Sequence, residues 1–272
     1  MVHSVSRELK FKRAWDVLAE RKSAEEIVFG PCLAPKYSRK QDFAYFGSLE
    51  KQLNIGYGGV ILDVGCGPLA RAENYFSLKG LEIVGLDVSS VTLKKARENV
   101  RKYGIKDNIS LVQGDAEFLP FRRDTFKVIL CIGLISHLPS KKSVYNSLRE
   151  MRFCLEKNGV CYVDWLQNLY SVLGLQQELI YKVPDFAQAD RVKLLHFRGF
   201  KEIESLFREA GLKIMKVLHG PLVYALTPFY HLFPADIKEG IDKLASFMDT
   251  LHERYPNLAF FCYSFDVVTQ KP

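Results

Sequence analysis

The central part of the chain alternates between short apolar runs and longer stretches of mixed apolar and polar positions. The apolar runs predict five strands, at 60–64, 82–87, 109–113, 126–132 and 160–165. The stretches between them carry apolar residues at helical spacing and predict helices, at about 70–79, 90–103 and 141–156. Strands that alternate with helices through short connections form a parallel sheet with helices on both faces. The pattern therefore predicts a doubly wound α/β fold.

The segment before the first strand has a different pattern. Residues 5–55 show helical spacing, with Phe11, Trp15 and Leu18 on one face. We expect breaks in this helical region at Gly30-Pro31 and at Pro35, because glycine and proline interrupt helices. The segment is therefore predicted to form an N-terminal helical cap over residues 1–55.

The alternation also breaks after the fifth strand. Beyond residue 165 the pattern predicts two helices and two strands, at 200–210, 235–254, 212–218 and 259–269. Long segments without clear alternation separate them. We therefore expect a core over 56–272 that carries cap insertions at about 166–198 and 220–257.

Composition narrows the class of protein. Of the 272 residues, 48% are apolar, which is enough for a large core. No apolar run approaches the roughly 20 residues that a membrane helix needs, and the N-terminus lacks a signal-peptide core. The net charge of +7 permits an acidic partner such as RNA. No long Lys/Arg block is present, however, and mild basicity is common among cytosolic proteins.

The six cysteines are scattered singly along the chain. They form no CxxC pair and no Cys/His cluster, so the sequence predicts no metal site. Several lie inside apolar runs, where cysteine behaves as a small core residue. This usage favours a reducing compartment and predicts a cytoplasmic location.

The stretch Val-Ile-Leu-Asp-Val-Gly-Cys-Gly-Pro at 60–68 is the most informative motif. A strand runs into Asp63 and then into Gly65 and Gly67, whose backbone can turn sharply and bring N–H groups against a ligand. Ligands of doubly wound sheets bind outside the carboxyl ends of the strands. The second strand ends at Asp87, which can accept hydrogen bonds from both ribose hydroxyls, and the third is followed by Asp115, which can accept an adenine amino proton.

Residues from about 59 to 165 resemble class I S-adenosylmethionine (SAM)-dependent methyltransferases, most closely the small-molecule branch that includes ubiquinone/menaquinone-biosynthesis-type enzymes. The matching motifs lie at 62–68, 84–89, 113–121, 131–138 and 155–159. The resemblance implies a Rossmann-like, seven-stranded, mostly parallel sheet with an antiparallel last strand. It also implies SAM as the cofactor and S-adenosylhomocysteine (SAH) as its product.

The resemblance assigns cofactor contacts by position. The implied cofactor-binding residues are Asp63, Gly65, Cys66, Gly67, Asp87, Val88, Asp115, Ala116, Cys131 and Ile132. The glycine loop would line the methionine and ribose, Val88 and Ala116 would lie against the adenine, and Ile132 would lie under the methionine. Leu69 stands where the family usually has a third glycine, so its side chain is expected to crowd the loop.

His137 is the leading catalytic candidate, because an imidazole titrates near neutrality and this turn follows the fourth strand. An ordinary turn histidine is the alternative. Further candidates for a general base are Tyr170, Asp164, His196 and His231. Aromatic residues in the three segments outside the sheet predict a planar or hydrophobic acceptor, or else form the small cores of the caps.

The sequence therefore predicts an enzyme that moves a methyl group from SAM to an oxygen, nitrogen or carbon atom of a small molecule by in-line displacement. One alternative is an RNA methyltransferase, which the basic charge permits. A second is an NAD(P)-dependent oxidoreductase, because residues 65–70 satisfy G-x-G-x-x-A and Asp87 follows at about the required distance. A third is a SAM-binding module without catalysis.

Overall fold

The computed structural model describes residues 2–33, 39–56, 58–104, 108–167, 169, 195–219 and 264–272, with single positions at 234, 237, 240 and 243. Its strands are β1 (Val60–Val64), β2 (Glu82–Asp87), β3 (Ile109–Gln113), β4 (Phe126–Cys131), β5 (Leu155–Gln167), β6 (Lys213–His219) and β7 (Ser264–Gln270). Its helices are α1 (Val2–Arg21), α2 (Ala24–Leu33), α3 (Arg39–Leu53), α4 (Arg71–Leu78), α5 (Ser90–Lys102), the 3₁₀ turn η2 (Ile135–His137), α6 (Lys141–Cys154) and α9 (Phe200–Glu209).

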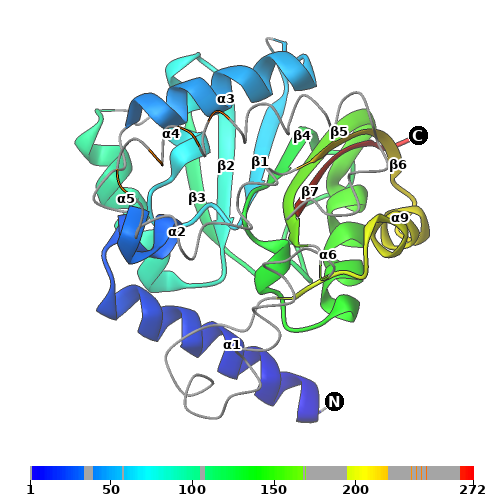
Figure 1. The fold of residues 1–272 in the computed structure, drawn as a ribbon, viewed down its shortest axis with the longest axis horizontal. Helices are drawn as coiled ribbons and strands as arrows, with labels where there is room; N and C mark the ends of the chain where they lie inside the picture. Colours follow the sequence, from blue (N-terminus) through cyan, green and yellow to red (C-terminus); the bar gives the residue numbers. More distant parts are fainter. Residues whose placement is uncertain are drawn as a thin grey trace.

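The strands form one seven-stranded sheet in the order β3-β2-β1-β4-β5-β7-β6 (Figure 1). Strands β1 to β5 pair in parallel, whereas β7 runs antiparallel between β5 and β6. The predicted doubly wound, mostly parallel sheet with an antiparallel last strand is thereby confirmed. The chain reverses strand order on either side of β1, and the cleft at such a reversal is where ligands of this architecture bind.

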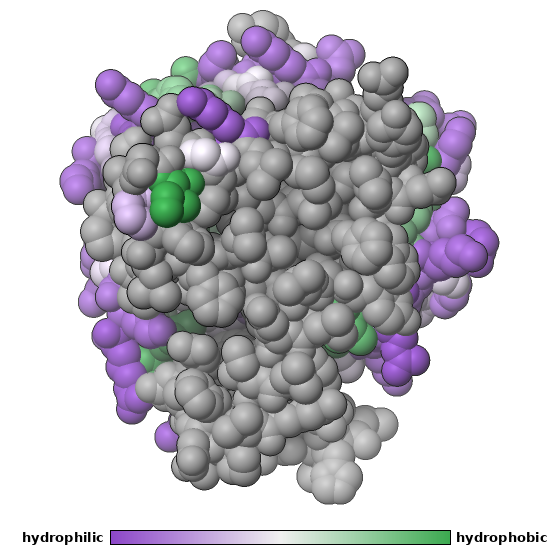
Figure 2. Space-filling model, viewed as in Figure 1, coloured by the Kyte–Doolittle hydropathy of each residue, from purple (hydrophilic) through white to green (hydrophobic). Residues whose placement is uncertain are grey.

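Helices cover both faces of the sheet. Apolar side chains of α6 and α9 pack against one face, including Leu148, Met151 and Phe207. The other face is covered by α3 and α4, which contribute Phe46 and Phe76 to a second cluster. The described helices turn polar sides outward, as the hydrophilic rim in Figure 2 shows. The division into a cap over 1–55 and a core over 56–272 stays a prediction.

Local sequence signals explain most of the element boundaries. Ser89 caps α5, since its hydroxyl accepts a hydrogen bond from the Thr92 N–H at 3.1 Å, and Gly104 follows the helix with a φ of +72°. Strands β1, β2 and β3 have the predicted bounds, and β4 ends one residue before the predicted end. Most of the predicted helix at 235–254 and the start of the last strand, at 259–263, lie outside the described residues.

Two predicted boundaries were wrong. The N-terminal break lies at Lys22-Ser23, and α2 continues through Gly30-Pro31. Ser23 and Glu26 form a reciprocal capping box, with backbone-to-side-chain distances of 2.9 and 3.1 Å, and this box starts α2. The predicted break at Pro35 lies outside the described residues.

Strand β5 is much longer than the predicted 160–165 and includes the Asn158-Gly159 turn signal. Its pairing with β4 already begins at Leu155, and its pairing with β7 extends to Gln167. The register with β4 shifts between Leu155 and Val160, so Asn158 and Gly159 lie in an irregularity of the strand, where Asn158 adopts a φ of +62°. The turn signal therefore marks a bulge inside β5 and not the start of the strand.

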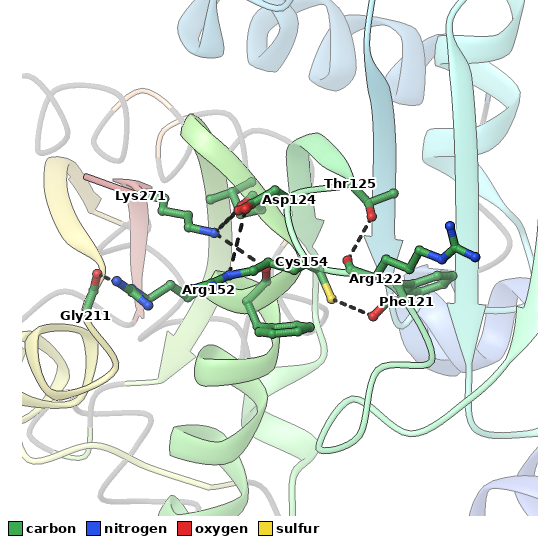
Figure 3. A network of polar contacts seen from close by, with 11 residues as sticks. Phe121, Arg122, Asp124, Thr125, Arg152, Cys154, Gly211 and Lys271 are labelled. Atoms are coloured by element: carbon green, nitrogen blue, oxygen red, sulfur yellow. Dashed lines mark hydrogen bonds and ion pairs between the residues drawn. The ribbon is translucent and has the colours of Figure 1, made fainter.

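A polar network holds the amino-terminal ends of β4 and β5 together (Figure 3). The Lys271 ammonium donates a hydrogen bond to the Leu155 carbonyl at 2.6 Å and pairs with the Asp124 carboxylate. Nearby, the Arg152 Nε donates to the Gly211 carbonyl at 2.9 Å. These contacts join the C-terminal strand to the end of α6 and to the loop before β4.

Replacing Lys271 with Met is expected to lower the free energy of unfolding by about 2 kcal/mol, because the buried Leu155 carbonyl loses its donor. Urea denaturation measures the change. The Lys271 hydrogen bond lowers the pKa of Asp124, so the stability from this pair is present above the ordinary Asp pKa and disappears as pH falls below it. The exposed Lys201→Met is the matched control. Equal stability of the two variants would contradict the assignment.

Candidate functional site

A cavity of about 370 Å³ opens at the carboxyl ends of the parallel strands. Helix α1 lies across this end of the sheet, below it in Figure 1, and α1 and α2 contribute Trp15, Ile27 and Val28 to the cavity wall. The sheet side is formed by the loops that follow β1 to β4 and by the carboxyl-terminal ends of β2 and β5. The predicted site residues that line the cavity are Gly65, Gly67, Asp87, Val88, Asp115, Ala116, Ile132 and His137.

The glycine loop after β1 needs two left-handed residues. Gly65 has a φ of +83° and Gly67 a φ of +65°. A Cβ at Gly65 would lie 3.1 Å from the Leu134 Cβ, so a side chain does not fit there without displacing Leu134. The Gly65 and Cys66 N–H groups donate to the Leu86 carbonyl at 2.7 and 3.0 Å, which ties the loop to β2.

Asp87 joins the glycine loop to the start of α5. Its Oδ2 accepts a hydrogen bond from the Gly67 N–H at 3.2 Å, and its Oδ1 accepts one from the Ser89 N–H at 2.9 Å. Burial raises the pKa of Asp87 to about 6, although these two bonds oppose the shift. The Ser89 hydroxyl in turn donates to the Asp16 carboxylate of α1 at 2.6 Å. Helix α1 is therefore hydrogen-bonded to the N-cap of α5, two residues after Asp87.

A second carboxylate lies one strand further along. The Asp115 Oδ1 accepts a hydrogen bond from the Glu117 N–H at 2.8 Å, and burial raises the pKa of this group. Val88 and Ala116 line the cavity between the two carboxylates. This end of the cavity thus combines apolar surface with acceptors for hydroxyl and amino protons.

Three predicted residues do not line the cavity. Asp63, Cys66 and Cys131 are buried behind it. Burial raises the pKa of Asp63 and of the neighbouring Glu73, and neither Glu73 oxygen has a hydrogen-bond partner. These groups are buried beside the glycine loop and do not face the cavity.

His137 lines the cavity with a largely buried imidazole ring. Its ring meets the Trp15 indole edge to face, with centroids 5.2 Å apart. The Nδ1 atom is buried without a hydrogen-bond partner, and burial lowers the pKa of the ring to about 4. The imidazole is therefore neutral at physiological pH. It is suited to hydrogen bonding with a ligand and is a weak base.

Sequence reasoning did not assign several lining residues to the site. Arg71 opens α4, and its Nε donates to the Asp42 carboxylate at 2.5 Å. Arg71 supplies the positive charge among the described lining residues. Trp15 also lines the cavity, whereas the sequence pattern predicts only that it lies on one face of a helix. Trp165 is the last residue of the predicted fifth strand and Gln167 lies two residues beyond it, where the rule that ligands bind at carboxyl ends would have found them.

The remaining predicted candidates lie elsewhere. Asp164 and His196 are buried and do not line the cavity, and Tyr170 and His231 fall outside the described residues. Leu69 is buried and also does not line the cavity. The structure therefore gives no sign that its side chain crowds this space.

Within the described ranges, no group of three or more His, Cys, Asp or Glu side chains is arranged to hold a metal ion. In the same part of the chain, no helix has both the length and the apolar character needed to cross a membrane.

The region that forms the sheet side of the cavity also resembles known proteins. Residues 61–159 match the family described as Methyltransferase domain. Sterol 24-C-methyltransferase ERG6B of Gibberella zeae is 30% identical over 151 residues, which make up 51% of this chain and 39% of that enzyme. Ubiquinone/menaquinone biosynthesis C-methyltransferase UbiE of Pectobacterium carotovorum subsp. carotovorum is 34% identical over 136 residues, or 47% of this chain and 53% of that enzyme. The chain thus covers about two fifths to one half of these relatives.

Solved structures share the fold. A SAM-dependent methyltransferase from Methanosarcina mazei aligns with 82% of this chain and 96% of its own, with a TM-score of 0.58 and 15% sequence identity. At this identity the likeness concerns the arrangement of strands and helices.

Proposed function

Because this chain carries a class I SAM-dependent methyltransferase domain, we propose that it transfers a methyl group from SAM to an oxygen, nitrogen or carbon atom of a small molecule. The main support is that the glycine loop, Asp87 and Asp115 come from three separate loops and border one cavity. A dinucleotide dehydrogenase has no comparable use for the Asp115-Ala116 position, which makes that alternative less suitable.

The cavity fits the cofactor chemically. Asp87 would accept hydrogen bonds from the ribose hydroxyls, and Asp115 would accept one from the adenine amino group. Val88 and Ala116 would pack against the adenine. Arg71, held by Asp42, would donate to the carboxylate of the amino-acid portion. Asp63, Cys66 and Cys131 would act from behind by supporting the loops.

Bound SAM supplies a methyl group that its positively charged sulfonium already activates for displacement. The task of the protein is then to position the acceptor and exclude water. Trp15 and α1 would cover the cavity, and Ile132 and Leu134 would form an apolar wall. His137 would accept a hydrogen bond from a hydroxyl or amine of the acceptor and so orient its lone pair toward the methyl group.

The acceptor is proposed to be an uncharged, hydrophobic small molecule. The cavity wall near His137 includes Leu134, Leu138 and Trp165. The names of the relatives above refer to a sterol and to ubiquinone/menaquinone biosynthesis, which is in keeping with an apolar acceptor. We place the reaction in a reducing cytoplasm, because Cys66, Cys131, Cys154 and Cys161 are free thiols.

Addition of SAM or SAH is expected to raise the melting temperature, whereas NADH is expected to leave it unchanged. At 100 times Kd, mass action stabilises the folded state by about 2.7 kcal/mol. Thermal unfolding followed by circular dichroism measures the shift. Stabilisation by NADH and not by SAM would reverse the assignment.

The transfer itself is tested by incubating the protein with methyl-labelled SAM and a cell extract. The label is expected in a small apolar product identified by mass spectrometry, and heat-inactivated protein is the control. Label found only in RNA would favour the RNA methyltransferase alternative. Binding of SAM without any labelled product would favour a non-catalytic module.

A further inference from the structure

Strand β5 contains an irregularity at the cavity wall. Its register with β7 shifts between Val163 and Leu166, which leaves Asp164 and Trp165 in a bulge. Trp165 has a φ of +53°, in the left-handed region that costs a residue with a side chain roughly 1–2 kcal/mol. Trp165 lines the cavity and is 40% exposed. A large aromatic residue is thus kept in a strained conformation at the wall of the site, which points to a function.

Two side chains hold the Trp165 backbone in this conformation. The Trp165 N–H, which has lost its place in the strand ladder, donates to the Asp266 Oδ1 at 3.1 Å. The Trp165 carbonyl accepts a hydrogen bond from the hydroxyl of Ser136. Ser136 belongs to η2, the same turn that carries His137. The orientation of the indole is therefore coupled to β7 on one side and to the His137 turn on the other.

The bulge is also tied to the neighbouring cavity loop. The Asp164 Oδ1 accepts a hydrogen bond from the Gly133 N–H at 2.6 Å, and Gly133 lines the cavity. The Asp164 Oδ2 accepts a hydrogen bond from the Tyr45 hydroxyl of α3 at 3.2 Å. The Tyr162 hydroxyl donates to the Asp266 Oδ2 at 3.2 Å. Both carboxylates are therefore already bonded to the protein at both oxygens, which suits a fixed support.

We propose that Trp165 is a specificity-determining wall for the methyl acceptor, and that Asp266 and Ser136 are positioning residues that hold its indole in the cavity. This inference rests on the proposed function. The indole offers a broad, rigid apolar face, and Ser136, neutral His137 and Gln167 add no charge beside it. The acceptor class that fits this wall is a flat, uncharged ring compound.

Tryptophan fluorescence gives a direct test, because Trp15 and Trp165 are the two tryptophans of the chain and both line the cavity. Trp15→Phe leaves Trp165 as the sole indole. With saturating SAH, a neutral planar probe, 6-propionyl-2-dimethylaminonaphthalene, is expected to quench Trp165 emission saturably by energy transfer. Trp165→Ala is expected to weaken probe binding about tenfold, whereas Trp165→Phe keeps most of it. SAH affinity is measured by calorimetry in Trp15→Phe and in the Trp15→Phe proteins that also carry Trp165→Ala or Trp165→Phe. The Trp165 substitutions are expected to change it by less than about threefold relative to Trp15→Phe alone, which also verifies folding.

Positioning by Asp266 is tested in the Trp15→Phe background. Asp266→Ala is expected to move Trp165 emission to longer wavelength and to weaken probe binding several-fold. Asp266→Asn retains an oxygen that accepts from the Trp165 N–H and is expected to restore both signals. A general structural role would not be rescued in this way.

Unchanged probe affinity in Trp165→Ala would overturn the inference, as would unchanged emission and probe binding in Asp266→Ala. Absence of Trp165 quenching in the Trp15→Phe protein would overturn it as well. Failure of SAH to bind the unmodified protein would instead overturn the proposed function, so the two failures are distinguishable.

Discussion

Asp87→Ala is expected to weaken SAH binding by about 100-fold, which corresponds to about 2.7 kcal/mol. The carboxylate lines the cavity and orders the Gly67 and Ser89 N–H groups around it. A hydrogen bond to a charged group contributes about 1.5–3 kcal/mol, so loss of the proposed ribose contacts would account for this effect. Isothermal titration calorimetry with SAH measures the change directly.

Two controls define this effect. Glu82→Ala removes an exposed carboxylate from the start of the same strand and is expected to leave SAH affinity unchanged. In the unmodified protein, affinity is expected to fall as pH drops below about 6, because the Asp87 pKa is raised by burial and the protonated carboxyl group is a poorer acceptor. Asp87→Asn should remove this pH dependence. Normal SAH affinity in Asp87→Ala would exclude the assigned ribose contact.

Gly65→Ala is expected to lower SAH affinity by about 10- to 100-fold and to destabilise the fold by about 1–2 kcal/mol. The stability loss comes from placing a Cβ at a φ of +83°. The affinity loss comes from the same Cβ, which meets Leu134 at 3.1 Å and forces the cavity wall to move. Urea denaturation and SAH calorimetry measure the two effects separately.

The matched control for this substitution is Gly104→Ala. Gly104 has a φ of +72°, but a Cβ there has no neighbour within 4 Å, and the residue lies outside the cavity. It is expected to show the backbone strain and to retain full SAH affinity. If both variants bound SAH equally well, close packing of the loop against Leu134 would not be needed for the site.

The sequence predicted the sheet well because its strands are uniformly apolar and lie between turn signals. The bounds of β1, β2 and β3 follow directly from this pattern. The rule that ligands bind at the carboxyl ends then brought Asp87 and Asp115 into one site without any knowledge of the fold in three dimensions. Both signals are local, so they can be read from a single chain.

The errors arose where longer-range or competing signals decide the structure. At the N-terminus, the Gly30-Pro31 pair received more weight than the Ser23–Glu26 capping box, which is the stronger signal for where a helix begins. In β5, pairing with β4 at Leu155 and again from Val160 onward joins the segments on either side of Asn158 into one strand. No local pattern reports such partners.

Contacts between residues far apart in the sequence also decide which residues reach the site. Arg71 is held in place by Asp42, which lies 29 positions earlier in the sequence. Trp15 reaches the cavity because α1 lies across the end of the sheet and packs against α5, and Trp165 does so through a bulge fixed by Asp266. These positions depend on tertiary contacts. The family resemblance could assign cofactor contacts such as Asp63 and Cys131, but their roles stay predictions.

The position of β7 has a consequence for synthesis of the protein on the ribosome. This strand is the last of the described strands in sequence, yet it lies between β5 and β6 and carries Asp266. A nascent chain that has not passed residue 264 therefore has a gap in its sheet and an unsupported Trp165. Since domains fold as units during translation, the proposed acceptor wall can form only after β7 has been synthesised, and chains that stall before this point lack it.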